Sequence, residues 1–238
     1  MKKIVGFAIV ILICIACREM KTVVIQEKPS QDWITLFNGS SFDHWRGYLS
    51  EEMYPEWTIE DGAIAFIPGE RGGKNIISRE KYTNFILSIE WKISEGGNSG
   101  IFWGVYEDPA FRQAHDTGPE IQVVDNDKHP DGKYPGGLHS AGSLYDMIAP
   151  PKDVTNPVGE WNHCIIEVNH DTNLGKATMN GIELFTFPVH GDDWDAMIAK
   201  SKFKDWKGFG KHQTGHIGLQ DHGDKVWYRN IKIKKLDE

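Results

Sequence analysis

A carboxylate and a carboxamide stand two residues apart in the segment TGPEIQVVDN, residues 117–126. Glu120 and Gln122 alternate there with the apolar Ile121 and Val123, a period typical of a β-strand with one buried face. The polar face is either ordinary solvated surface, where most carboxylates lie, or the floor of a polar pocket. In a pocket, Glu120 would act as a general base or acid, and Gln122 would hydrogen-bond a polar substrate.

A second polar pair lies in GHIGLQDHG, residues 215–223. Gln220 and His222 have the opposite parity to Ile217 and Leu219, so their side chains are expected on a polar face. An imidazole titrates near neutral pH and can transfer protons. His222 is therefore a candidate catalytic residue, and Gln220 is a candidate for substrate binding.

The Gly-rich segment GGLHSAGSLYDMIAP, residues 136–150, is typical of a loop that carries function on a rigid scaffold. Its His139 is either a proton shuttle near neutral pH or a loop histidine held by a structural hydrogen bond. The sequence leaves both interpretations open. We therefore count His139 among the candidate catalytic residues.

Three further polar positions flank these segments. His115 and Asp125 border the TGPEIQVVDN strand. The run Asp125-Asn126-Asp127 either caps a turn or offers oxygen ligands to a divalent cation such as calcium, but no sustained ligand motif indicates a required metal. Arg229 could clamp hydroxyl groups or form a structural salt bridge, because its parity is that of a core isoleucine.

Strand patterns predominate among the elements that must position these residues. Strands are predicted in NFILSIEWKI (84–93), GIFWGVY (100–106), HCIIEVN (163–169), KATMNGIELFTF (176–187), GHIGLQDHG (215–223) and VWYRNIKIKKL (226–236). Asn180-Gly181 predicts a two-residue hairpin turn. A helix is predicted over residues 190–206, with aspartates near its start and lysines later. The sequence therefore predicts an all-β fold, an antiparallel sandwich with one or two short helices.

The chain of 238 residues carries a net charge of −8 and has no Lys/Arg cluster, which argues against nucleic-acid binding. Residues 1–17, MKKIVGFAIVILICIAC, have the layout of a secretory signal, and the ending IAC resembles a lipoprotein signal that lipidates Cys17. A plain signal peptide cleaved elsewhere is the alternative. Residues 18–31 are expected to be a tether and residues 32–238 one domain. We expect a cell-envelope protein whose membrane contact is the lipid alone, and its oligomeric state stays open.

Many motifs of the chain occur together, in this order, in one family. They are WITLFNGSSFDHW, WTIEDGAI, NFILSIEWKISEGGNSGIFWGV, GPEIQVVDN, AGSLYDMIAP, GEWNHCIIEV, MNGIEL and GHIGLQDHGDKVWYRNIKI. With them, the sequence resembles the 3-keto-disaccharide hydrolase family, which is abundant in exported bacterial proteins. The resemblance covers roughly residues 33–236.

The resemblance implies a concanavalin A-like jelly roll, with two stacked antiparallel sheets, one of them concave. It also implies cleavage of glycosides whose sugar has been oxidised to a 3-ketone, by hydrolysis or by 1,2-elimination. The ketone acidifies the hydrogen on C2, so the reaction needs a base, a donor for the enolate oxygen and an acid for the leaving group. Glu120, His139 and His222 are the expected catalytic residues. Ser140 stands where relatives often have a basic residue, so a contact there is in doubt.

On the same resemblance, the concave sheet would bind an oligosaccharide or glycoside. Trp103 and Tyr145 are expected to stack on a sugar ring. The remaining substrate-binding candidates are Gln122, Gln220, Arg229, His115 and Asp125. The alternative function is a non-catalytic carbohydrate-binding lipoprotein, which would have an aromatic platform without a convergent acid and base.

Overall fold

The structure is a computed structural model that describes residues 32–68 and 73–236. The predicted signal with Cys17 and the predicted tether, residues 1–31, lie outside the described residues. None of the helices in the described ranges is both long and apolar enough to span a bilayer.

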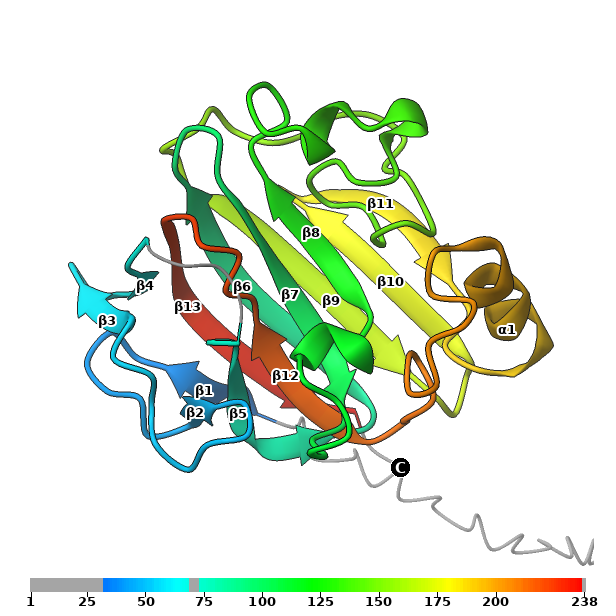
Figure 1. The fold of residues 1–238 in the computed structure, drawn as a ribbon, viewed down its shortest axis with the longest axis horizontal. Coiled ribbons are helices and arrows are strands. Elements are labelled where there is room, and N and C mark those ends of the chain that lie inside the picture. Colours follow the sequence, from blue (N-terminus) through cyan, green and yellow to red (C-terminus); the bar gives the residue numbers. More distant parts are fainter. Residues whose placement is uncertain (1–31, 69–72, 237–238) are drawn as a thin grey trace, which may run out of the picture. The chain divides into compact units, whose positions relative to one another are not determined.

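Two antiparallel sheets form the domain (Figure 1). The first has eight strands, in the order β11-β10-β9-β6-β13-β4-β3, with β1 also paired to β13. Its strands are β1 (Ile34–Phe37), β3 (Trp57–Glu60), β4 (Ala63–Phe66), β6 (Phe85–Ile93), β9 (Asn162–Asn169), β10 (Leu174–Met179), β11 (Ile182–Phe187) and β13 (Val226–Lys235). This arrangement confirms the predicted all-β sandwich.

The second sheet has five strands, in the order β2-β5-β12-β7-β8. They are β2 (Trp45–Gly47), β5 (Ile76–Tyr82), β7 (Asn98–Val105), β8 (Glu120–Val124) and β12 (Gly215–Leu219). Strands β12, β7 and β8 lie side by side, as Figure 1 shows. The short 3-10 helices η1 (Ala114–Asp116), η2 (Asp131–Lys133) and η3 (Pro135–Gly137) lie in the segments flanking β8.

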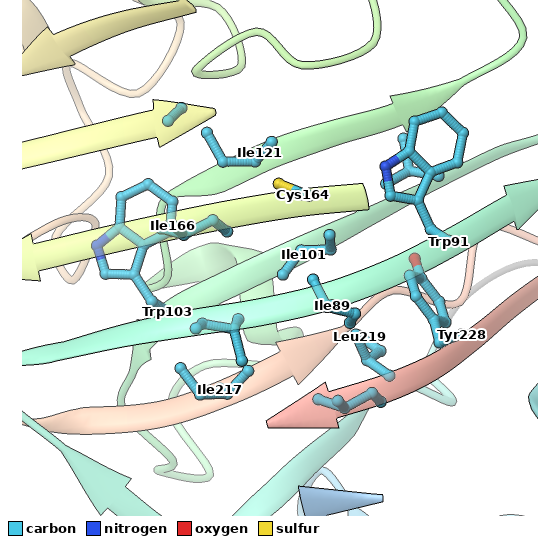
Figure 2. Close-up of a cluster of buried hydrophobic side chains, with 14 of the residues drawn as sticks. Ile89, Trp91, Ile101, Trp103, Ile121, Cys164, Ile166, Ile217, Leu219 and Tyr228 are labelled. Carbon is cyan, nitrogen blue, oxygen red and sulfur yellow. The ribbon is translucent and has the colours of Figure 1, made fainter. Parts of the chain in front are cut away.

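Apolar side chains from the inner faces of both sheets make one core (Figure 2). Ile101, Ile121 and Leu219 come from the five-stranded sheet, and Ile89 and Cys164 come from the eight-stranded sheet. All five are fully buried. Burial raises the pKa of the Cys164 thiol to about 12, so this residue is a small core hydrophobe.

Strand β8 shows the predicted alternation. Ile121 and Val123 lie in the core, whereas Glu120 and Gln122 face away from it. The edge of β8 is covered by the Gly-rich segment, because Gly142 donates its N–H to Gln122 O at 2.9 Å and Tyr145 donates to Glu120 O at 3.0 Å. This pairing holds Tyr145 beside Glu120.

The predicted helix over residues 190–206 is shorter in the structure. Helix α1 covers Gly191–Lys200, and the backbone at Ser201 is extended (φ −96°, ψ 174°). The Ser201 hydroxyl donates to Ile198 O at 2.8 Å and accepts from Phe203 N at 3.1 Å, so local bonds replace the helical ones. The chain therefore turns after α1, and residues 202–206 run to the outer face of the five-stranded sheet.

Candidate active site

A cavity of about 360 Å³ opens on the outer face of the five-stranded sheet, over β7 and β8. Six of the residues predicted from sequence line it: His115, Glu120, Gln122, Tyr145, Gln220 and His222. The sequence analysis did not single out the other lining residues, which are Asn98, Gln113, Asp131, Lys202, Phe203, Trp206 and Asp221. The structure thus brings together the polar face of β8, the Gly-rich segment and the segment after β12.

Glu120 is the most perturbed carboxyl group of the cavity. Its residue is only 6% exposed, and burial raises its pKa to about 8; the charge of Lys202 opposes this shift and that of Asp131 adds to it. Oε1 of Glu120 packs against the Cα of Gly100, where a Cβ atom would overlap it. Near neutral pH, this carboxyl therefore exchanges a proton readily, as a general acid or base must.

Lys202 brings a cation to the same cavity. Its ammonium lies 4.1 Å from the ring centroid of Tyr145, a cation–π contact. Loss of solvent contact lowers the pKa of Lys202, although Glu120, Asp146 and Asp131 act to raise it. The backbone N–H of Lys202 donates to Asp146 Oδ2 at 2.6 Å, which ties the segment after α1 to the Gly-rich segment.

His139 lies behind the cavity wall and is not among the described residues that line it. Its ring stacks between Tyr134 and Tyr145, with centroids at 3.7 and 4.3 Å, and its Nε2 bonds Asp146 Oδ1 at 2.8 Å. The expected role as a group that touches substrate does not fit this position. His139 instead orients Tyr145 and Asp146, in line with the structural alternative.

Three buried oxygen atoms of the cavity have no hydrogen-bond donor within the described part of the chain. They are Asn98 Oδ1, Glu120 Oε1 and Gln220 Oε1. Buried polar atoms are paired in the great majority of cases, so such a group of exceptions needs an explanation. Gln122 Oε1, in contrast, accepts a hydrogen bond from the backbone N–H of Val123 at 3.0 Å. The cavity floor therefore offers the unpaired side-chain oxygens of Asn98, Gln220 and Glu120 to a ligand.

Three predicted binding residues lie outside this cavity. Trp103 is in the core, 5% exposed and 5.7 Å from the Phe187 ring, because it has the inward parity of Ile101 on β7. The prediction that Trp103 stacks on a sugar is therefore wrong.

Asp125 is 2% exposed and holds a turn, since its Oδ1 accepts from the backbone N–H groups of Asp127 and Lys128 at 2.9 and 3.2 Å. Its Oδ2 accepts from Gly96 N at 2.7 Å. These bonds correspond to the turn-capping alternative. Asp125 is not among the described residues that line the cavity.

Arg229 lies on the outer face of the eight-stranded sheet. Its Nε donates to Glu90 Oε2 at 2.7 Å, and its guanidinium stacks on Trp161 at 4.0 Å. It therefore forms the salt bridge that the sequence analysis kept as the alternative, here partly exposed, and it does not clamp a ligand in the cavity.

Three of the polar lining residues that sequence reasoning missed show why it missed them. Lys202 was counted with the lysines of a longer helix, and Asp131 lies in the short helix η2, which has no periodic pattern. Asn98 stands at the start of the apolar strand β7, with the outward parity of Gly100. That parity was the one available signal.

Comparison with known proteins places this chain in one family. Residues 32–234 match the family described as the 3-keto-alpha-glucoside-1,2-lyase-like domain. A protein of Bacteroides thetaiotaomicron named 3-keto-disaccharide hydrolase is 38% identical over 232 residues, which is 86% of this chain and 79% of the relative.

Solved structures of similar proteins have the same fold. A protein described as a candidate glycosyl hydrolase from Parabacteroides distasonis superposes with a TM-score of 0.78 at 32% identity, over 86% of this chain and 94% of that one. The carbohydrate binding module CBM66 from Bacillus subtilis, at 11% identity and a TM-score of 0.51, covers 85% of this chain and 99% of its own and shares the fold alone. The fold is of the concanavalin A-like type. The match over nearly all of residues 32–236 shows that the chain belongs to the 3-keto-disaccharide hydrolase family, whose domain is described as 3-keto-alpha-glucoside-1,2-lyase-like.

Proposed function

We propose that this protein cleaves glycosides whose sugar carries a ketone at C3, by elimination through an enolate at C2. The family and the name of the Bacteroides thetaiotaomicron relative supply the substrate class. One observation carries the mechanism: a buried carboxyl with a pKa of about 8, Glu120, shares a polar cavity with the ammonium of Lys202.

Glu120 in its charged form takes the proton from C2 of the sugar. A carboxylate whose pKa is raised by burial is a stronger base than a solvated one, and its pKa lies near the working pH. The electron pair of the C2–H bond moves into the enolate, whose negative charge falls on the C3 oxygen. Lys202 is the cation of the cavity that can stabilise this charge.

The enolate then expels the aglycone. The C1–O bond breaks, a C1=C2 double bond forms, and the aglycone oxygen takes up the proton that Glu120 accepted. The products are the free aglycone and an enone sugar, and no water is consumed. Addition of water to the enone at C1 in a later step would give the net result of hydrolysis. Glu120 then serves as base and acid in turn.

The remaining side chains of the cavity would hold the sugar. Gln122, Gln220 and Asn98 present amides to the hydroxyl groups, and Tyr145, Phe203 and Trp206 supply aromatic surface for the C–H faces. The oxygens that lack donors match a ligand rich in O–H groups.

The test incubates the protein with a 3-keto-glucoside that bears a chromogenic aglycone, and in parallel with the unoxidised glucoside. We expect release of the aglycone from the ketone substrate alone, together with an enone that absorbs in the ultraviolet. A protein that binds both sugars tightly and releases no aglycone would instead be a binding module. Release without a transient enone would contradict the elimination and favour direct hydrolysis.

We also propose that the mature protein is anchored to the cell envelope by a lipid on Cys17. The proposal rests on the signal-like residues 1–17 and their ending IAC. Mass spectrometry of the protein from the membrane fraction should show an acylated N-terminal cysteine. The Cys17→Ser variant should leave the membrane fraction, and a variant that stays there without the modification would contradict the proposal.

A further inference from the structure

A histidine-containing cluster adjoins the cavity on the side of Asn98. His129 lies in the segment after β8, and His222 and Asp224 lie in the segment between β12 and β13. One ligand atom from each of the three side chains lies within 4.8 Å of those from the other two. The two imidazole rings are 5.6 Å apart at an interplanar angle of 74°, and His222 Nδ1 is 3.5 Å from Asp224 Oδ2.

The surrounding backbone prepares two of these groups for a metal ion. The N–H of Asp131 points at His129 Nδ1 at 3.1 Å and orients the imidazole ring, and a metal ion bound at this nitrogen would take over the lone pair from that contact. The N–H of Asn98 donates to Asp224 Oδ2 at 3.1 Å and orients the carboxylate. Metal ligands in proteins are commonly fixed by such second contacts.

Asn98 supplies an independent observation. Its side chain is almost fully buried, with the residue 1% exposed, and its Oδ1 has no hydrogen-bond donor among the described residues. The Nδ2 of the same amide lies 3.5 Å from His129 Nδ1 and donates to Asp131 Oδ2 at 3.0 Å. An unpartnered acceptor therefore lies within a few ångströms of the cluster, where an ion or an ion-bound water would satisfy it.

We propose that His129, His222 and Asp224 bind a divalent transition-metal ion at the wall of the cavity. Two imidazoles and one carboxylate suit Zn²⁺, Mn²⁺ or Co²⁺, whereas calcium prefers oxygen ligands alone. The oxygens of the Asp125 turn, the calcium candidate from the sequence, are already occupied by backbone N–H groups.

Three protein ligands leave open positions on the ion. Because His222 and Asn98 also line the cavity, an open position can face a sugar oxygen; this role rests on the proposed function. His222 is then a ligand and not the proton donor, which agrees with Glu120 moving the proton in both directions.

The test uses tag-free protein stripped with a chelator and titrated with Co²⁺ and with Zn²⁺. We expect one ion per chain by calorimetry, with the visible absorption of Co²⁺ reporting nitrogen ligands. His129→Gln and Asp224→Asn should each weaken the affinity at least about tenfold. The control is His44→Ala, an exposed histidine of the same domain, which should bind as the unchanged protein does.

Circular dichroism and thermal melting establish that each variant is folded. If one is not, the milder variant Asn98→Ala replaces it. Asn98→Ala should weaken metal binding because it removes the Oδ1 acceptor beside the cluster. Absence of binding by the unchanged protein overturns the proposal, as does equal affinity in His129→Gln, Asp224→Asn and His44→Ala. These measurements need no substrate. Failure to bind metal with glycoside cleavage intact therefore sinks only this inference, and metal binding without cleavage sinks only the proposed function.

Discussion

The outer face of each sheet carries a glutamate with a basic side chain nearby, but only one of the two glutamates is fully hydrogen-bonded. On the eight-stranded sheet, Glu90 accepts from Arg229 Nε at 2.7 Å and from Asn230 Nδ2 at 2.8 Å, so each carboxylate oxygen has a donor. On the five-stranded sheet, Glu120 is buried, its Oε1 has no donor among residues 32–68 and 73–236, and Lys202 provides the nearby cation.

The two carboxyl groups titrate in opposite directions as a result. Burial acts to raise the pKa of Glu90, but the bonds from Asn230 and Arg229 outweigh it and lower that pKa. Burial of Glu120 prevails and raises its pKa to about 8. A satisfied charge stabilises a surface, whereas an unsatisfied one in a cavity is a candidate for chemistry. The comparison teaches that donor count, not residue type, separates structure from function.

The largest expected effect follows from removing the proton-transfer group. Glu120→Gln keeps the size of the side chain but cannot exchange a proton, so we expect kcat for a 3-keto-glucoside to fall roughly a thousandfold. The matched control, Glu90→Gln, should retain the activity of the unchanged protein. Equal kcat values for the two variants, measured by release of the aglycone, would remove the contrast between the faces.

A smaller loss is expected from moving the carboxyl without changing it. In Gly100→Ala the added Cβ would overlap the Glu120 carboxyl group and push it from its place. A misplacement of about 1 Å can cost about a hundredfold in rate. Gly175→Ala on β10 is the control, since its Cβ would overlap the Phe187 ring in the eight-stranded sheet rather than the Glu120 carboxyl group. Full activity in Gly100→Ala would show that the position of Glu120 is unimportant.

Glu120 should also make stability depend on pH. Its pKa in the folded state, about 8, lies above the ordinary value of 4.5, so its folded form is favoured while protonated. Stability from this group is complete below about pH 4.5 and is lost as the pH rises through 8. Glu120→Gln should therefore become more stable than the unchanged protein by a few kcal/mol between pH 5 and pH 9. Urea unfolding at both pH values measures this, and a constant difference would contradict the raised pKa.

Lys202 is the cation of the comparison, and its loss should matter less. Lys202→Met keeps the aliphatic stem on Tyr145 but removes the charge that faces the enolate, so we expect kcat to fall roughly tenfold. The effect is smaller than for a fully enclosed donor because the residue is still exposed to solvent, although the groups packed around its ammonium remove enough water to lower its pKa. Lys204→Met, an exposed neighbour, should leave kcat unchanged. A rise in KM with kcat unchanged would assign Lys202 to ordinary sugar binding.

The sequence could predict the faces of strands but not the contacts between segments. Alternation placed Ile121 in the core and Glu120 in the cavity, because side chains on a strand alternate strictly. It failed for Trp103, since β7 is buried on both faces and its apolar run gives no hint of direction. Only the parity that Trp103 shares with Ile101 indicated that its side chain points into the core, and the prediction of sugar stacking did not follow that indication.

Loop residues are a different matter. Lys202 enters the cavity because Ser201 ends helix α1 with two local hydrogen bonds, and helix ends are poorly marked by periodicity. His139 was predicted correctly as a loop residue of the site region, but one layer of stacked rings separates it from the cavity. Distances of this kind arise from tertiary packing, which a single sequence does not encode locally.

The smallest effect tests the other half of the comparison. Glu90→Gln removes a carboxylate whose pKa is lowered, and such a group contributes stability above its ordinary pKa that is lost as the pH falls through the folded value. The variant should therefore be less stable than the unchanged protein near pH 7, and the difference should shrink toward pH 3. Because Arg229 is 39% exposed at its side chain, solvent screening keeps the difference below about 1 kcal/mol. Urea unfolding of both Gln variants across the same pH range should give slopes of opposite sign, and slopes of the same sign would mean that the donors around Glu90 do not distinguish it from Glu120.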